Sequence, residues 1–326
     1  MRLAFFSTVL SSAVLIFLNG LAVGQAQSHK RLNPVIALLE QNKPVFGVYA
    51  PSNGGRRGGP EMPARPASEL AKDALGYPTA DFLFNGSMEG GVDRALPAYI
   101  DFVKAMDEVA GPAKTPFFGL ARPFIVKAPK VAPDYAKATE NISRELNVGS
   151  AGIMLVETES AEEVRRGIAA MRFASNGGTR PDEVGAAPAH WGMNEKEYKQ
   201  KADVWPLNPN GELINWTIVE SKEGLAHVRE IAAVKGIGVL WPGAGTLRGV
   251  FSSTNAAGER VLDTAGWENA IQQVLAACKE FHVPCGYPAN VDDIETRMKQ
   301  GFSVFVMNWG DAGFKAVDVG RKAAGR

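Results

Sequence analysis

Short apolar runs recur along the chain and alternate with segments that have helical periodicity. There are eight such runs, and they occupy residues 44–52, 80–87, 115–124, 151–158, 213–221, 236–245, 283–290 and 302–310. Each run is nearly continuous rather than alternating, which is typical of parallel strands covered on both faces. Between several of them, apolar residues recur at the spacing of an amphipathic helix, as in 160–173, 222–234 and 290–301. The pattern predicts repeated strand–helix units.

Eight such units predict a (β/α)8 barrel in a single domain, which we place at residues 28–326. A barrel of about 250 residues is commonly one domain, and 45% hydrophobic residues are sufficient for a large core. An open doubly wound sheet is the alternative, but no G-x-G-x-x-G turn follows an early strand. Two long connections, residues 53–66 and 175–212, interrupt the pattern, and long loops at strand ends often build or cover a site.

The first 27 residues have a different character. Arg2 precedes a long apolar run, and small residues follow it near positions 22–27. A positive start, an apolar middle and a small-residue end predict a secretory signal peptide. We therefore expect an exported protein, periplasmic or secreted, without stable membrane association once residues 1–27 are removed. The alternative is an uncleaved N-terminal membrane anchor, because the run is long enough to span a bilayer.

Charge and cysteine content narrow the functional class. The formal net charge is zero and no long run of one sign occurs, which argues against nucleic-acid binding. We expect a small-molecule substrate instead. Cys278 lies in an apolar helical segment and Cys285 opens the strand after it. Two small buried hydrophobic residues are the favoured interpretation, and a disulfide is the alternative.

The C-terminal ends of the predicted strands carry the candidate chemistry, because (β/α)8 barrels place their sites there. The polar or flexible residues at these ends are Asn85, Ser87, Glu89, Arg122, Glu157, Glu159, Glu220, Gly245, Thr246, Asn308 and Asp311. Clustered carboxylates are costly unless a cation relieves them. Oxygen ligands suit Mg2+ or Mn2+, and zinc is disfavoured because these ends have no cysteine or histidine.

Five stretches, in this order, resemble the HpcH/HpaI aldolase and citrate-lyase-beta-like family: "LLEQNKPVFGVY", "LARPF", "GIMLVETESAEEV", "GGTRPDEVGAA" and "TIVESKEGLAHVREIAAVKGIGVLWPGAGTL". The resemblance implies a barrel of the phosphoenolpyruvate/pyruvate type. It also implies carbon–carbon bond cleavage by retro-aldol chemistry on 2-oxo acids or acyl-CoA esters, with a divalent metal. A homo-oligomer is implied as well.

The same resemblance assigns roles to individual residues. Glu220 matches the family's metal-binding glutamate, and Arg122 matches the arginine that neutralises substrate oxygen charge. Asp311 lies at the family's eighth-strand aspartate. Two positions depart from the pattern: Thr246 stands where the second metal ligand is an aspartate, and Met88 stands where the general base is expected. We therefore predict that the metal binds weakly.

Other residues could take over the missing functions. Glu157 or Glu159 could supply the second metal ligand, although an acid at this point also serves to begin a helix. His190, on the long connection, could supply the base, although a lone loop histidine is usually solvated. Asn85, Ser87, Gly245, Thr246 and Asp311 are the candidates for substrate binding. Two functions result: a metal-dependent lyase acting on a small 2-oxo or hydroxy acid, or a small-molecule-binding barrel that has lost catalysis.

Overall fold

The computed structural model of the protein describes residues 30–53, 64–111 and 115–326. The predicted signal peptide at residues 1–27 lies outside these ranges. Residues 31–326 form one unit. Within the described ranges, no helix has the length and apolar character needed to cross a membrane.

Eight parallel strands form a closed barrel. They are β1 (Val45–Tyr49), β2 (Phe82–Asn85), β3 (Phe124–Lys127), β4 (Gly152–Leu155), β6 (Leu213–Val219), β7 (Ile237–Pro242), β10 (Gly286–Pro288) and β11 (Val304–Met307). Each strand pairs in parallel with the next, and β11 returns to pair with β1. A bridge between Leu240 and Cys285 closes the ring between β7 and β10, with the Leu240 amide donating to the Pro284 carbonyl over 2.9 Å. The predicted (β/α)8 barrel is confirmed.

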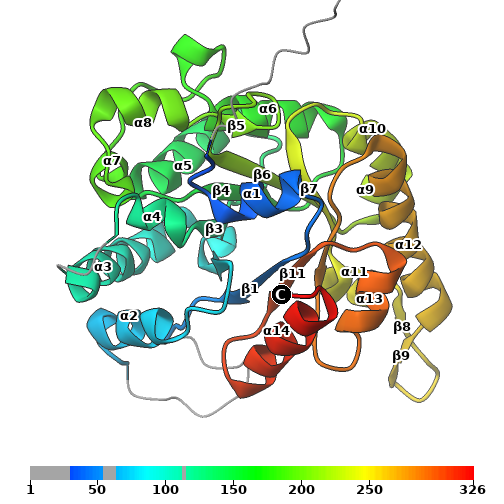
Figure 1. Ribbon diagram of the computed structural model, residues 1–326. Coiled ribbons are helices and arrows are strands. Elements are labelled where there is room, and N and C mark those ends of the chain that lie inside the picture. The colour runs from blue at the N-terminus through cyan, green and yellow to red at the C-terminus, as the bar shows by residue number, and fades with distance from the viewer. Residues whose placement is uncertain (1–29, 54–63, 112–114) are drawn as a thin grey trace, which may run out of the picture. The chain divides into compact units, whose positions relative to one another are not determined.

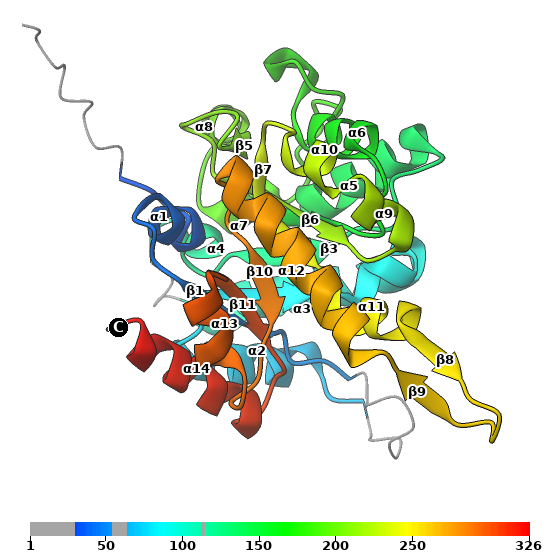
Figure 2. The same ribbon diagram turned by 90° about the vertical axis from the view of Figure 1, so that its right-hand side faces the viewer.

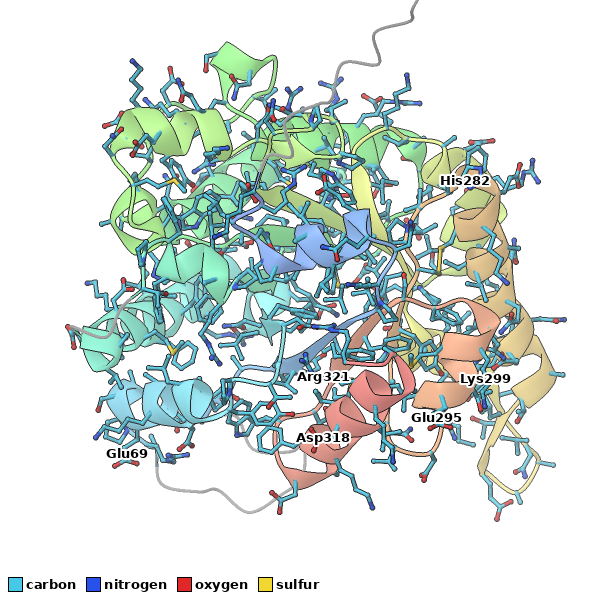
Figure 3. The ribbon with its side chains drawn as sticks, viewed as in Figure 1. Glu69, His282, Glu295, Lys299, Asp318 and Arg321 are labelled. Carbon is cyan, nitrogen blue, oxygen red and sulfur yellow. A yellow bond between two sulfur atoms is a disulfide. The ribbon has the colours of Figure 1, made fainter. Side chains whose placement is uncertain are left out.

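Helices surround the strands (Figure 1). In chain order the helical elements are α1 (Pro34–Glu40), α2 (Ala67–Gly76), η1 (Ser87–Gly90), α3 (Val92–Ala110), α4 (Phe118–Ala121), α5 (Tyr135–Val148), α6 (Ala161–Met171), η3 (Ala174–Asn176), α7 (Ala187–Trp191), α8 (Glu195–Lys201), α9 (Lys222–Ala226), α10 (Val228–Ala232), α11 (Ala244–Val250), α12 (Thr264–Phe281), α13 (Ile294–Gln300) and α14 (Asp311–Ala323). Their outer faces carry charge, as Glu69 on α2 and Glu295 and Lys299 on α13 illustrate (Figure 3).

Three short strands lie outside the ring. The two-residue β5 (Val204–Trp205) pairs with the start of β6. The antiparallel hairpin of β8 (Ser252–Thr254) and β9 (Arg260–Leu262) follows α11 and projects from the barrel (Figure 2).

Two hydrophobic clusters divide the apolar side chains of the strands. Alternate strand residues point into the barrel or out toward the helices, as the period of two requires. Inside the barrel, Trp216 stacks between Phe84 and Trp241, with ring centroids 6.0 Å and 5.5 Å apart. Val35 and Ile36 of α1 pack into this inner cluster. Because α1 precedes the N-terminal end of β1, it closes the barrel at that end, and the opposite end stays open for a site.

The third strand lies later in the chain than predicted. Residues 115–124 were expected to form it, but Phe118–Ala121 form the short helix α4 and the strand runs from Phe124 to Lys127. Phe118 and Leu120 are buried, so their apolar character reflects a packed helical turn rather than a strand. The shift moves the C-terminal end of the strand from Arg122 to Lys127.

The two cysteines form a disulfide, contrary to the favoured interpretation. Cys278 lies on α12 and Cys285 directly precedes β10, and their Cα atoms are 5.7 Å apart. His282 ends α12 in a left-handed conformation with φ of 55°. This residue reverses the chain direction and brings Cys285 back beside the last turns of the helix.

Candidate functional site

A small cavity of about 170 Å3 lies at the C-terminal end of the barrel. All eight barrel strands line it, through Tyr49, Phe84, Lys127, Met154, Ile218, Trp241, Pro288 and Val306. Glu220 and residues 243–246 complete the lining. The cavity is therefore centred on the open mouth of the barrel, where this fold places its active sites.

Glu220 directly follows β6 and is only 3% exposed. Its Oε1 atom accepts a hydrogen bond from the backbone amide of Glu157, over 3.0 Å. Gly243 packs against the same side chain, since a Cβ atom at position 243 would lie 2.3 Å from the Cβ atom of Glu220 and 2.7 Å from its Oε2 atom. A buried carboxylate is costly without hydrogen-bond donors, so the Glu157 amide stabilises an acid that ends an apolar strand.

Lys127 is the cation in the lining of this cavity, and it is absent from the residues predicted from the strand ends. It is the last residue of β3, and its Nζ atom donates to Oε2 of Glu89 on η1 over 2.9 Å. The side chain is 15% exposed. Burial raises the pKa of the neighbouring Tyr49 phenol, while the charge of Lys127 opposes the rise. Pro123 was the residue that could have marked the start of this strand. Proline is commonly found on an edge strand or at the first residue of a strand, and an apolar run follows it.

A second lysine balances the other acids of this rim. The Nζ atom of Lys130 lies 2.7 Å from Oε2 of Glu159 and 4.0 Å from Oε2 of Glu157. The Ser221 hydroxyl also donates to Glu159, over 2.9 Å. Hydrogen bonding to Lys130 lowers the pKa of Glu159 and, reciprocally, raises the pKa of Lys130. Three of the rim glutamates, Glu89, Glu157 and Glu159, are thus balanced by lysines.

The donor atoms do not build a preformed divalent-metal site. In the ranges the structure describes, no group of three or more histidine, cysteine, aspartate or glutamate side chains is placed to hold a metal. Glu220 supplies the carboxylate of the cavity lining, and Thr246, in the first turn of α11, offers a neutral hydroxyl. The side chain of Glu157 lies near Lys130 and is exposed. Hard cations require several oxygen ligands, and their affinity follows ligand charge.

The expected substrate-binding residues divide between two places. Gly245 and Thr246 line the small cavity. Asn85 and Ser87 line a larger neighbouring cavity, where Oδ1 of Asn85 accepts from the Ser87 amide over 2.8 Å. Asp311 is the exposed first residue of α14 and lines neither cavity. Met88, where a general base was sought, is buried in the hydrophobic core.

Arg122 lies away from this site, so the structure corrects its expected position. It precedes β3, at the opposite end of the strand from Lys127, and lines neither cavity. Its guanidinium donates to the carbonyl oxygens of Ala74 and Tyr77, over 2.7 Å and 2.9 Å, at the end of α2. Burial lowers the pKa of this guanidinium. The contacts indicate a role in fastening α2 to the barrel.

His190 also lies elsewhere. It is 2% exposed on α7, and its Nδ1 atom lies 3.0 Å from Oδ1 of Asp107 on α3. Its ring packs against Gly119 and Gly149, near the N-terminal ends of β3 and β4. The long connection at 175–212 contributes no residue to either cavity. The expectation that this connection covers the site is therefore not met.

The larger cavity, of about 630 Å3, adjoins the small one. Tyr49, Phe84 and Lys127 line both. Its remaining lining comes from the loop after β1, from η1, and from α2 and α3. Asn53 and Arg65 belong to the first long connection, of which residues 54–63 lie outside the described ranges. This connection does border a cavity at the barrel mouth.

Comparison with known proteins gives structural similarities only. No protein-family description matches the chain, and no curated protein matches it. An HpcH/HpaI aldolase/citrate lyase family protein from Burkholderia cenocepacia J2315 is 21% identical, with a TM-score of 0.61 over 84% of this chain and 91% of that protein. Macrophomate synthase is 19% identical, with a TM-score of 0.60 over 90% of this chain and 89% of that protein. The HpcH/HpaI aldolase from Desulfitobacterium hafniense DCB-2 is 16% identical, with a TM-score of 0.57 over 84% and 89% of the two chains. The chain therefore has the (β/α)8 barrel fold of these HpcH/HpaI aldolase/citrate lyase family structures.

Proposed function

We propose that the protein is an aldolase-type carbon–carbon lyase that acts on a small anionic 2-oxo or hydroxy acid in the small cavity. One observation carries the proposal: Lys127 from β3 and the buried Glu220 after β6 line the same cavity at the mouth of the barrel. Fold similarity to aldolases is consistent with this chemistry, although folds of this type host many reactions. In this proposal Lys127 takes the role that was expected of Arg122, and Glu220 keeps the role of the carboxylate in the site.

Each group has a defined task in a retro-aldol step. Cleavage of the bond between C3 and C4 of a 4-hydroxy-2-oxo acid leaves the electron pair on the C3 enolate and converts the C4 alcohol into an aldehyde. Lys127 donates hydrogen bonds to the substrate carboxylate and to the 2-oxo oxygen, where negative charge develops. Glu220 accepts the C4 hydroxyl proton and then returns it to C3 of the enolate. Atoms and charges balance without a further reactant.

A divalent metal has less support than these two side chains. When bound, such an ion stabilises an enolate oxygen by its charge, but the donors around Glu220 do not form a site for it. We therefore propose weak metal binding through Glu220, and we assign the fixed positive charge of the cavity to Lys127.

The decisive experiment is a turnover assay with a panel of 2-oxo and hydroxy acids, in the presence of Mg2+, Mn2+ or a chelator. Glu220→Gln and Lys127→Met should both abolish cleavage. Lys130→Met is the matched control, since Lys130 is also paired with a glutamate on this rim but lines neither cavity. Wild-type turnover in both site variants would remove the assignment.

A binding protein without catalysis is the second candidate function. It is favoured by the loss of the expected general base: Met88 is buried in the core, and none of the histidines in the described ranges lines the small cavity. A thermal-shift screen with small carboxylic acids separates the two functions. Stabilisation by an acid that is never turned over, with or without metal, would establish the binder.

We also propose that the protein is exported after removal of residues 1–27. The disulfide between Cys278 and Cys285 supports this proposal, because disulfides persist mainly in oxidising compartments. The intact mass of the protein recovered from its native host would test it. A mass that includes residues 1–27 would contradict cleavage.

A further inference from the structure

The large cavity shares Lys127 with the small one but extends beyond the groups used in the reaction described above. We propose that it binds an uncharged apolar tail, aryl or branched alkyl, of the same acid whose charged head lies at Lys127. This inference rests on the proposed function and names its substrate class.

The two cavities are arranged to hold two parts of one molecule. Tyr49, Phe84 and Lys127 line both, so a ligand whose carboxylate contacts Lys127 can extend into the large cavity past the two aromatic rings. The small cavity, of about 170 Å3, corresponds to about six waters at roughly 30 Å3 each. That volume accommodates the 2-oxo head of the substrate, which is three carbons long. The large cavity, of about 630 Å3, therefore exceeds what the reacting atoms need.

Part of the lining of the large cavity is apolar. Leu70 of α2, Ala98 and Phe102 of α3, and Phe84 of β2 face it. Tyr49 is 38% exposed, and among the described residues only two other large hydrophobic side chains are as exposed. Its ring packs edge-to-face on Phe84, with centroids 5.0 Å apart. Pockets lined by aromatic side chains beside a few polar groups are typical of small-molecule sites.

The charges of the large cavity argue against a second acid group on the tail. Arg65 already binds Glu69 and Asp73, over 3.2 Å and 2.7 Å. Glu89 and Asp101 also face the cavity and would repel a carboxylate there. Lys127 has one acidic partner, Glu89, where Arg65 has two, and it lines both cavities. We therefore place the acid group at Lys127, and the tail that fits is uncharged.

Calorimetric titration with three acids that share one head group tests the inference. Pyruvate presents the head alone, 4-methyl-2-oxopentanoate adds a branched alkyl tail, and phenylpyruvate adds an aryl tail. Burial of such a tail should tighten binding by about tenfold to a hundredfold relative to pyruvate. Ala98→Phe places a ring in the large cavity from an exposed position of α3. It should remove this gain, so that the tailed acids bind to this variant no more tightly than pyruvate does.

Ala136→Phe is the control, because Ala136 is an exposed helix residue of α5 that does not line the cavity. It should retain the full tail preference. If pyruvate binds and the tailed acids bind no more tightly, the tail site is wrong while the proposed function stands. If Ala98→Phe keeps the preference, the tail binds elsewhere and the inference also fails. If none of the three acids binds, the proposed function and the inference fail together.

Discussion

Removal of the Lys127 ammonium is the most direct test of the site, and Lys127→Met is the closest change in shape. An anionic oxygen about 4 Å from Nζ gains about 4 kcal/mol at an effective dielectric constant near 20. Glu89 already contacts the ammonium at 2.9 Å and offsets part of this gain. The net contribution of a hydrogen bond to a charged group is about 1.5–3 kcal/mol. We therefore expect a loss of about 2–3 kcal/mol, or roughly 30- to 140-fold weaker binding of a small 2-oxo acid.

Calorimetry with pyruvate measures this loss, and two variants make the result specific. Lys130→Met removes an ion pair of similar geometry, at 2.7 Å from Glu159, but lies outside both cavities, so its affinity should match the wild type. Arg122→Met should lower thermal stability, because it removes two hydrogen bonds to the end of α2, without changing the affinity of the folded protein. Equal affinity in the Lys127 variant and the wild type would refute the assignment. A selective loss in the Arg122 variant would restore the role predicted from the sequence.

Three further predictions concern the metal, the disulfide and a buried acid. Thr246→Asp should bind Mg2+ at least about tenfold more tightly than the weakly binding wild type in calorimetric titration, because it adds an anionic ligand beside Glu220; equal affinities would place the metal elsewhere. Replacing Cys278 and Cys285 by serine should lower the free energy of unfolding by about 2.5 kcal/mol, because the disulfide restricts the unfolded chain and the loop it closes is short. An unchanged denaturation midpoint under oxidising conditions would contradict this. Burial raises the pKa of Glu145 well above its usual range, and neither carboxyl oxygen has a hydrogen-bond partner among the described residues. Its contribution to stability is therefore lost as pH rises above the unfolded value of about 4.3, and Glu145→Gln should raise the melting temperature more near pH 7 than near pH 4.

The sequence predicted the barrel because its strands are buried on both faces, and such strands read as continuous apolar runs. The same property caused the error at the third strand. Residues 115–124 are as apolar as the true strands, and periodicity cannot distinguish a short buried helical turn from a strand. Phe118 and Leu120 are buried in α4, and the strand begins only after Pro123. The prediction of the barrel depends on eight runs together, whereas the position of one strand boundary depends on a few residues.

The positions of the candidate residues were predicted in part, for a related reason. Glu220 was identified correctly as a strand-end residue because β6 is long and well marked, and it does line the cavity. Lys127 was missed because the displaced boundary placed Arg122 at the strand end. The position of His190 depends on tertiary packing: its ring fits against Gly119 and Gly149, where a Cβ atom would lie 2.5 Å and 2.6 Å from its Cδ2 atom. Sequence spacing carries no information about such a contact.

The charges of the small cavity link metal binding to acid binding. Lys127 and Glu220 together give the lining of this cavity a formal charge of zero. A bound monoanionic substrate therefore lies beside one positive and one negative side chain. Thr246→Asp would add a negative charge, which at about 5 Å from a bound carboxylate costs up to about 3 kcal/mol at an effective dielectric constant near 20. With a chelator present, this variant should bind pyruvate more weakly than the wild type, because nothing offsets the added charge. With saturating Mg2+ the variant should bind pyruvate more tightly than the wild type, because the bound ion makes the net charge added at this position positive. If the variant binds pyruvate equally well under both conditions, position 246 does not face the bound acid, and the placement of the head group beside Lys127 and Glu220 is wrong.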